Sequence, residues 1–400
     1  MRDGWDVKPL KEVCLIKPPK SEARKGQNAD FFVSFAPMET LGIDQKYLIT
    51  NQTRTMSDVI GSYTYFTNGD VLLAKITPCF ENGKLGIASD LINNIGFGSS
   101  EYIVFRANEQ LDAEWLYYYL SRQSFRNEGA SRMAGAVGHK RITKDFIEDY
   151  PIPIPPLPEQ RRIVAILDEA FEGIATAKAN AEKNLQNARE IFESHLNAVF
   201  SQRGEGWVEK RLDEVGKTQT GSTPKASEPE NLGKHIPFVK PGDFKPDGSI
   251  TYDNEGLSQN GAAKARLVMA PSAIMVCIGA TIGKSAYANR IIATNQQINS
   301  LTPATGISAK MVYYQMITVD FQRRVHENAG QATLPIINKS KWSSLSIFIP
   351  PTVEEQNHIV ARLDNLHEET QHLESLYQHK LAALDELKQS LLHQAFNGDL

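Results

Sequence analysis

Two long stretches of the chain carry apolar residues at alternating steps of four and three, the spacing of a coiled-coil seam. Each seam then takes one extra step of four, to Leu185 and to Leu381, before the step of three returns. Such a stutter locally unwinds a supercoil, so its recurrence at the same place predicts two long helices that pack against each other. The first seam consists of Ile163, Leu167, Ala170, Ile174, Ala177 and Ala181, and the second of Ile359, Leu363, Leu366, Thr370, Leu373 and Tyr377.

These two stretches are copies of one another. The first begins PPLPEQRRIVAILDEAFEGI at Pro155, and the second begins PPTVEEQNHIVARLDNLHEET at Pro350. The matching continues at one offset of 196, which relates Asp168 to Asp364 and Phe200 to Phe396. Solenoid and propeller repeats have periods of about 20 to 50 residues, so a repeat of this length indicates a domain with an attached tail, present twice.

Prolines separate each tail from the body before it, because proline excludes helix at the preceding residue. A helix of about 42 residues spans ~63 Å. The first helix leads from the first body to the second, so a pseudo-symmetric partner must run back. We therefore expect antiparallel helices, with the C-terminus close to the first body.

The bodies contain short apolar runs of the length of β-strands, bounded by turn residues. We expect an α+β protein: two small mixed α/β domains with antiparallel or barrel-like sheets, separated by two long antiparallel coiled-coil helices, with a pseudo-two-fold internal repeat. The expected domains are 1–154, helix 155–203, 204–349 and helix 350–400. The predicted strands are 31–38, 70–76, 99–106, 236–241, 272–279 and 297–303, and an aromatic helix follows each set, at 114–123 and 310–324.

Composition narrows the class of protein. The chain is 41% apolar and 22% charged, which is typical of globular proteins. Its three cysteines show no C-x-x-C spacing, as expected in a reducing compartment. The N-terminus lacks the features of a signal peptide, and no apolar run reaches the roughly 18 residues of a membrane span. We expect a soluble, cytoplasmic protein without a membrane partner.

The formal net charge of −4 is unusual for a protein that binds nucleic acid. The charge is unevenly distributed, however. Residues 350–400 hold 3 basic and 9 acidic side chains, whereas residues 204–349 hold 16 basic and 12 acidic ones. A phosphate-binding surface is therefore compatible with the bodies, provided that it is a local patch.

Basic and amide side chains gather on glycine-rich, non-periodic segments at similar places in both bodies. Arginine can bond a guanine edge, asparagine or glutamine an adenine edge, and lysine or hydroxyl groups phosphate oxygens. A solvated loop explains any single one of these residues equally well, but the set favours DNA. The candidates are Lys84, Arg122, Arg126, Arg132, His139, Lys140 and Arg141 in the first body, and Thr220, Ser222, Thr223, Lys225, Lys240, Lys284, Arg323, Arg324, Asn328 and Gln331 in the second.

Signals for catalysis are weak. Residues 279–285 resemble a phosphate-binding loop but have three residues between the glycines where G-x-x-x-x-G-K-[ST] requires four, so a turn is the better interpretation. Five histidines lie on the second tail without the i, i+4 spacing of a helical metal site. The chain is expected to bind rather than to catalyse, with no catalytic residue, metal or cofactor of its own.

Several segments resemble the DNA specificity subunits of type I restriction-modification systems. They are GHKRITKDFIEDYPIPIPPLPEQRRIVAILD, IFIPPTVEEQNHIVARLD, TGSTPK with IPFVKPGDF, ATNQQINSL and KQSLLHQAFNGDL. The resemblance covers the whole chain and is most specific at the Pro-Pro-x-x-Glu-Gln helix starts.

This resemblance implies that the bodies are target recognition domains that read the two halves of a split, asymmetric, double-stranded DNA sequence. The tails would form a spacer and dock two methyltransferase subunits. Methylation of adenine, with S-adenosylmethionine, and translocation and cleavage, with ATP and Mg, would belong to the methyltransferase and restriction subunits. The alternative is a protein-interaction scaffold, or a decoy chain of similar shape, that does not bind DNA sequence-specifically.

Overall fold

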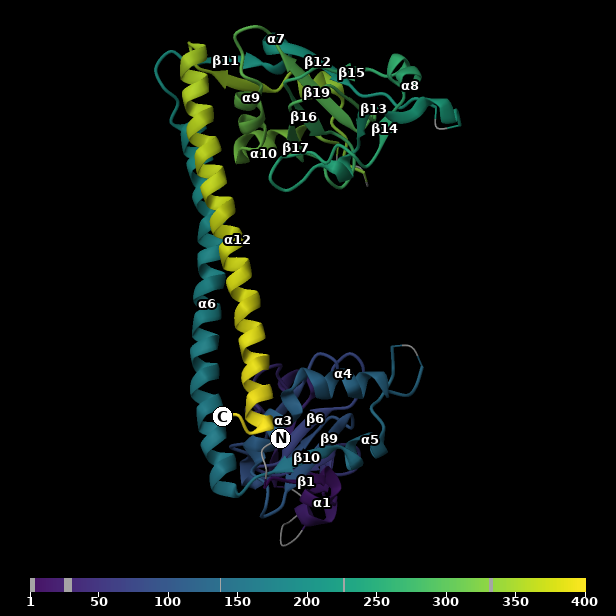
Figure 1. Ribbon diagram of the computed structural model, residues 1–400, viewed down its shortest axis with the longest axis vertical. Coiled ribbons are helices and arrows are strands. Elements are labelled where there is room, and N and C mark those ends of the chain that lie inside the picture. Colours follow the sequence, from purple (N-terminus) through teal and green to yellow (C-terminus); the bar gives the residue numbers. More distant parts are fainter. Residues whose placement is uncertain (1–3, 25–30, 137, 226, 331–333) are drawn as a thin grey trace. The chain divides into compact units, whose positions relative to one another are not determined.

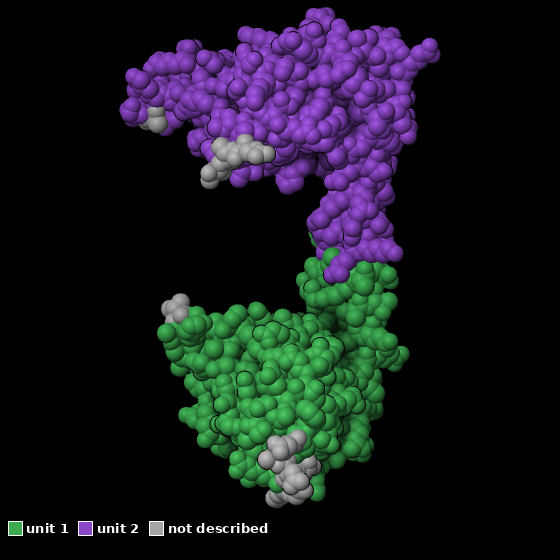
Figure 2. Space-filling model, turned by 180° about the vertical axis from the view of Figure 1, so that it is seen from behind, with its two compact units in different colours: residues 1–181, 379–400 green, residues 182–378 purple. Residues whose placement is uncertain are grey.

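The computed structural model describes residues 4–24, 31–136, 138–225, 227–330 and 334–400. The chain forms two compact units (Figures 1 and 2). Unit 1 comprises residues 1–181 and 379–400, and unit 2 comprises residues 182–378. Each unit therefore combines one globular body with part of each of two 45-residue helices, α6 (Leu157–Ser201) and α12 (Val353–Asn397).

The body of unit 1 contains two four-stranded sheets and a separate antiparallel pair, β1 with β10. One sheet, in the order β2-β9-β6-β7, is antiparallel throughout. The other, in the order β4-β3-β8-β5, contains a parallel pair, β3 with β8. The strands are β1 Asp6–Pro9, β2 Cys14–Ile16, β3 Phe32–Ala36, β4 Gln52–Thr55, β5 Thr64–Phe66, β6 Val71–Ala74, β7 Leu85–Ile87, β8 Gly96–Gly98, β9 Tyr102–Ala107 and β10 Pro151–Ile154.

Short helices complete this body. The aromatic helix α3 packs on β6, β7 and β9 and brings the fully buried Trp115 into the core. Asp112 caps α3 by accepting hydrogen bonds from the backbone of Glu114 and Trp115. The helices are α1 Leu10–Val13, α2 Met56–Val59, α3 Ala113–Ser121, α4 Gln123–Ser131 and α5 Lys144–Asp149, with 3-10 turns η1 Lys20–Arg24, η2 Met38–Thr40 and η3 Ile92–Asn94.

The body of unit 2 repeats this topology. Its sheets have the orders β12-β19-β16-β17 and β14-β13-β18-β15, the second again with one parallel pair, β13 with β18, and β11 pairs with β20. The strands are β11 Val208–Arg211, β12 Gly216–Thr220, β13 Leu232–Val239, β14 Gly256–Leu257, β15 Leu267–Val268, β16 Ser272–Val276, β17 Ser285–Ala288, β18 Ile292–Thr294, β19 Ile298–Pro303 and β20 Ser346–Ile349. The helices are α7 Leu212–Val215, α8 Gln259–Lys264, α9 Ala309–Met316, α10 Val319–Asn328 and α11 Lys339–Ser343, with 3-10 turns η4 Pro229–Asn231 and η5 Pro241–Asp243.

The α+β class and the internal repeat are thus confirmed, and two details differ from expectation. Each body has two sheets rather than one, and one of them is mixed. The helix expected at 310–324 is two helices, because α9 ends at Met316 and Thr318 caps α10 by accepting a hydrogen bond from the backbone of Phe321.

The two long helices are antiparallel within each unit. In unit 1, Arg162 donates to the carbonyl of Leu400 (2.8 Å) and Lys178 pairs with Asp385. In unit 2, Arg189 pairs with Glu374 (2.9 Å). As residue numbers increase along α6, the residue numbers of its partners near and along α12 decrease. The two helices therefore run in opposite directions, as the repeat predicts.

Each unit completes its core with the end of one long helix and the start of the other. In unit 1, Phe396 from the end of α12 packs against Trp115, with ring centroids 4.5 Å apart, beside Leu167 from the start of α6. In unit 2, Phe200 from the end of α6 shares a core with Leu363 from the start of α12. The C-terminus thus lies in unit 1, as expected.

The matched tails also make matched polar contacts. Tyr118 donates a hydrogen bond to Asp168, which also accepts from Lys46 (2.7 Å). In unit 2, Tyr314 donates to Asp364 (2.5 Å), which also accepts from Lys310 (2.6 Å). The two tyrosine contacts fix the start of each long helix on the aromatic helix of its body, whereas Lys46 lies before β4 and Lys310 lies on α9. Across the described parts of the chain, no helix has the length and apolarity needed to cross a membrane.

Candidate nucleic-acid interface

The basic loop predicted in the first body follows α4 and folds back on itself. The backbone groups of Ala134 and Arg141 exchange two hydrogen bonds (2.9 and 2.8 Å), and Gly135 allows the reversal with φ +127°. The backbone of Thr77, beyond the end of β6, donates to the carbonyl of Lys140 (3.0 Å). The loop is therefore held at the end of the antiparallel sheet.

Arg141 forms the most defined polar contact of this loop. Its Nε and Nη2 donate to the two carboxylate oxygens of Glu101 (2.9 and 2.8 Å), a bidentate pair that fixes the plane of the guanidinium. These hydrogen bonds hold the pKa of Glu101 below its usual value. The side chain of Arg141 is still 47% exposed, so the group is both oriented and accessible.

The other predicted residues of this loop are exposed. Arg132 pairs with Glu128 one turn earlier (2.8 Å), an i, i+4 contact on the surface. The ring of His139 lies against the neighbouring carbonyl of Gly138 (2.8 Å), and the side chain of Lys140 extends into solvent. The structure therefore brings Arg132, His139, Lys140 and Arg141 together on one exposed loop.

Three further candidates of the first body have partners within it. Arg122 stacks on Tyr119, with its guanidinium carbon 3.5 Å from the ring centroid, and donates to the Tyr119 carbonyl. Arg126 donates to Gln123 (2.7 Å) and lies against Gly83, where a Cβ would approach its Nη1 to 2.3 Å. Lys84 donates to the carbonyl of Met38 (2.8 Å). These contacts give each side chain a structural role, and a DNA contact for them stays a prediction.

In the second body, the candidates from the end of β12 to Lys225 lie beside the start of β19 and the turn that joins β18 to β19. Thr220 donates to Asn299 (2.7 Å), and Thr223 donates to Gln296 (2.6 Å). Ser222 accepts from the backbone of Arg266 (2.8 Å). These contacts gather hydroxyl and amide groups at one end of the sheet.

The lysine candidates of the second body differ in exposure and in their partners. The Lys225 side chain is 82% exposed and lies 3.9 Å from Glu228, so it is largely solvated. Lys240 pairs with Glu255 (2.5 Å). Lys284 donates to the carbonyl of Phe244, which repeats the contact of Lys84 in unit 1, and Gly283 before it adopts φ +88° in a turn.

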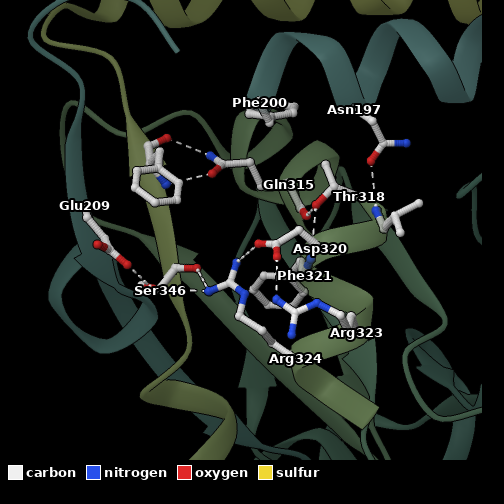
Figure 3. Close-up of polar contacts among 12 residues, drawn as sticks. Asn197, Phe200, Glu209, Gln315, Thr318, Asp320, Phe321, Arg323, Arg324 and Ser346 are labelled. Carbon is white, nitrogen blue, oxygen red and sulfur yellow. Dashed lines mark hydrogen bonds and ion pairs between the residues drawn. The ribbon is translucent and has the colours of Figure 1, made fainter. Parts of the chain in front are cut away.

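The candidates on α10 are held by their own helix and by β20 (Figure 3). Arg324 donates to the carbonyl and hydroxyl of Ser346 (2.9 and 3.1 Å) and pairs with Asp320. Arg323 is exposed and pairs with Asp320 (2.8 Å) and Glu327 (2.6 Å). Asn328 donates to the carbonyl of Arg324 (2.9 Å), and Gln331 lies outside the described residues.

Sequence reasoning overlooked several polar residues of these surfaces. Glu101, Gln296 and Gln297 sit on the turns before β9 and β19, and the exposed Arg266 lies beside the loop of Ser222. The run Asn295-Gln296-Gln297 is the one local signal, because three consecutive amides between two apolar strands are unusual for a plain turn. Among the described residues, no cluster of histidine, cysteine and carboxylate side chains is arranged to hold a metal ion.

Comparison with known proteins gives the family. The type I restriction modification DNA specificity domain matches residues 2–186 and again residues 204–380. The specificity subunit of type I restriction enzyme EcoAI from Escherichia coli is 37% identical over 163 residues, which are 40% of this chain and 27% of that protein. That of HindI from Haemophilus influenzae is 30% identical over 199 residues, 49% of this chain and 42% of that protein. The matches thus span less than half of the length of these relatives.

Solved structures show the same fold. One, described as revealing complex assembly and conformational transition of the type I R-M system, has a TM-score of 0.80 at 22% identity and covers 100% of this chain and 99% of its own. The HsdS subunit from Thermoanaerobacter tengcongensis has a TM-score of 0.67 at 21% identity, with 100% and 98% covered. The family match occurs twice, once for each copy of the repeat, and together the two matches include most of the chain. The chain therefore belongs to the type I restriction modification DNA specificity domain family.

Proposed function

We propose that this chain is the DNA specificity subunit of a type I restriction-modification complex. Each body reads one half of a split DNA sequence, and the helical pair sets the gap and docks two methyltransferase subunits. The observation that carries the proposal is the repeat itself: two bodies share one topology and the same helix contacts, but differ in the chemistry of their exposed loops. A repeated frame with different loops suits an asymmetric, bipartite target.

The chemistry of modification belongs, in this proposal, to partner chains. Methyltransferase subunits would hold S-adenosylmethionine and the target adenine, and a restriction subunit, where present, would use ATP and Mg. The nine acidic side chains of residues 350–400 make the second tail a poor DNA surface, and this supports its assignment to protein docking. This chain itself recognises the DNA sequence and sets the distance between the two half-sites.

The exposed loop after α4 offers the first test. Its cations Arg132, Lys140 and Arg141 are replaced together by alanine in the assembled methyltransferase, and DNA affinity is measured at several salt concentrations. Removing one phosphate contact should reduce the slope of log affinity against log salt by about 0.9, and removing a base contact should weaken specific binding.

A charge-matched control separates this effect from a change in net charge. Lys8, Lys11 and Lys144 also lie in the body of unit 1 but outside this loop, and Lys11 pairs with Asp149. Their triple alanine variant should leave specific affinity within about twofold. Equal weakening in both variants, or unchanged affinity in the loop variant, would contradict the assignment of this loop to DNA.

A further inference from the structure

One turn in each unit occupies the same place in the repeated fold. Residues 99–101 join β8 to β9, and residues 295–297 join β18 to β19. The carbonyl of Glu101 accepts from the backbone of Lys75 (2.9 Å), and the carbonyl of Gln297 accepts from the backbone of Cys277 (2.7 Å). Glu101 and Gln297 are therefore equivalent positions, again at the offset of 196.

The loops that follow α4 and α10 are equivalent as well. Each is pinned to the strand beside it: Ile142 donates to the carbonyl of Lys75 (2.9 Å), and Ile337 donates to the carbonyl of Cys277 (3.0 Å). One residue earlier, isolated β-bridges join Ile76 to Arg141 and Ile278 to Ile336. Arg141 and Ile336 are thus equivalent positions, each on the loop that adjoins the turn.

We name these two pairs the reading positions: Glu101 with Arg141 in unit 1, and Gln297 with Ile336 in unit 2. Their backbone frame is shared but their chemistry is different. In unit 1 a carboxylate holds a guanidinium through two hydrogen bonds. In unit 2 an amide lies in the place of the carboxylate and an aliphatic side chain in the place of the arginine.

The reading positions of unit 1 leave one edge of the arginine available. Glu101 accepts from Nε and Nη2 of Arg141, whereas the remaining contact, from Nη1 to the carbonyl of His139, is long at 3.3 Å. The Nη1 and Nη2 edge of a guanidinium can bond guanine O6 and N7 at the same time. Glu101 is consequently a positioning residue that orients this edge.

In unit 2 the amide of Gln297 is partly exposed. The Nε2 of Gln297 has a long contact, 3.4 Å, with the carbonyl of Ile278, and its Oε1 accepts from Asn295 (2.9 Å). A Cβ on Gly279 would lie 3.7 Å from this Nε2 and 3.9 Å from Leu334 Cδ1, so the amide and the aliphatic loop converge there. Leu334 and Ile336 are 51% and 44% exposed.

Groups that suit the DNA backbone flank both pairs. Lys140 and His139 precede Arg141 on its loop. In unit 2, Thr223 bonds Gln296 beside Gln297, and this contact brings the loop with the exposed Lys225 to the same turn. Cations that position a duplex beside groups that can read base edges form the usual arrangement of a DNA reader.

We propose that the reading positions discriminate bases, and that they do so differently in the two bodies. Arg141, oriented by Glu101, reads a guanine in one half-site. Gln297 reads an adenine in the other half-site, and Ile336 contacts the methyl group of a thymine there. This inference rests on the proposed function. It adds the identity of the residues that contact base edges and the base that each one selects.

The test maps methylated sequences in cells that express the chain with its methyltransferase subunit. Arg141→Ala and Glu101→Gln should each relax one G·C position in one half-site, lowering its discrimination by about tenfold to a hundredfold for the alanine variant and less for the glutamine variant. Gln297→Ala should relax one A·T position in the other half-site. The double variant Gln297→Glu with Ile336→Arg should move that position towards G·C.

Lys11→Ala is the matched control, because Lys11 and Asp149 form an exposed ion pair of unit 1 that includes neither reading position. It should leave both half-sites unchanged. Methylation that continues with unaltered base preference in the Arg141 and Gln297 variants would overturn the inference and leave the proposed function intact. A wild-type complex that methylates no split sequence would overturn both. If an Arg141 or Gln297 variant does not assemble, the same methylation map of the milder variants Glu101→Gln and Ile336→Ala tests the inference in its place.

Discussion

Gln160 donates its side-chain amide to the carbonyl of Gln110 at 2.8 Å, and Gln356 makes the equivalent bond to the carbonyl of Gly306 at 3.1 Å. Each amide oxygen also accepts from the backbone before the aromatic helix, from Asp112 (2.8 Å) and from Ser308 (2.9 Å). Both side chains are buried. Gln160, in Pro-Pro-x-x-Glu-Gln, and Gln356, in Pro-Pro-x-x-Glu-Glu-Gln, thus fasten each long helix to its body.

Replacing either glutamine by leucine should destabilise its own unit. The change leaves a partly buried backbone N–H and carbonyl without their partner, and leaving a fully buried group unsatisfied costs about 1–3 kcal/mol, so we expect a loss at or below that range. Hydrogen exchange should show faster opening of α3 in Gln160→Leu and of α9 in Gln356→Leu. Gln186→Leu is the control, because Gln186 is exposed and bonds Glu190 on the same helix. Equal protection of the backbone amides of α3 and α9 from exchange in all three variants would show that Gln160 and Gln356 contribute little to the stability of their units.

The cysteines should differ sharply in reactivity. Burial raises the pKa of Cys14 and of Cys277 to about 12, so at pH 8 both thiols are protonated as well as inaccessible. Cys79 is partly exposed. A chromogenic thiol reagent should therefore modify one cysteine in the native chain and three in denaturant, and Cys79→Ser should abolish the native reaction. Rapid modification of two or more thiols in the native chain would contradict the burial of Cys14 and Cys277.

Alkaline pH should destabilise both units through their buried tyrosines. Burial, followed by the hydrogen bond to a carboxylate, raises the pKa of Tyr118 and of Tyr314. A raised pKa contributes stability that is present below the unfolded value of about 10 and is lost as the pH rises above it. Urea unfolding at pH 8 and pH 10.5 should give a larger decrease in stability for the wild type than for Tyr314→Phe. Identical decreases would show that this hydroxyl does not titrate with unfolding.

Shortening both long helices together should change the gap between half-sites. Seven residues can be removed from each helix between the ion pairs Lys178–Asp385 and Arg189–Glu374, which preserves the register. Seven residues are close to two turns and about 10.5 Å, or about three base pairs. Methylation mapping should then show unchanged half-sites with a gap shorter by about that amount. Altered half-sites with an unchanged gap would contradict the spacer role.

The sequence predicted the repeat, the long helices and their direction because these depend on periodicity and on internal similarity. It could not predict the environment of single cations. From the sequence, Lys84 and Lys284 are expected to be surface amines. In the structure Lys84 bonds the carbonyl of Met38, 46 residues away, and Lys284 bonds that of Phe244, 40 residues away, and such contacts leave no local pattern. The break between α9 and α10 rests on one capping threonine, Thr318, inside an otherwise helical pattern.

The candidate site was predicted in outline only. Basic loops are visible in the sequence, whereas the pairing of Arg141 with Glu101 joins residues that are 40 positions apart. The equivalence of Arg141 with Ile336 is hidden as well, since the loops differ in length and composition and only the backbone hydrogen bonds align them.

The proposed role is tested most directly by a methylation map of the genome of cells that express this chain with the proposed methyltransferase subunit. We expect one new methylated motif, made of two different half-sites separated by a fixed gap of unspecified bases. Methylation that requires the chain but falls on an unsplit or palindromic motif would contradict the two-reader arrangement. No new methylation from an assembled complex would contradict the role as a specificity subunit.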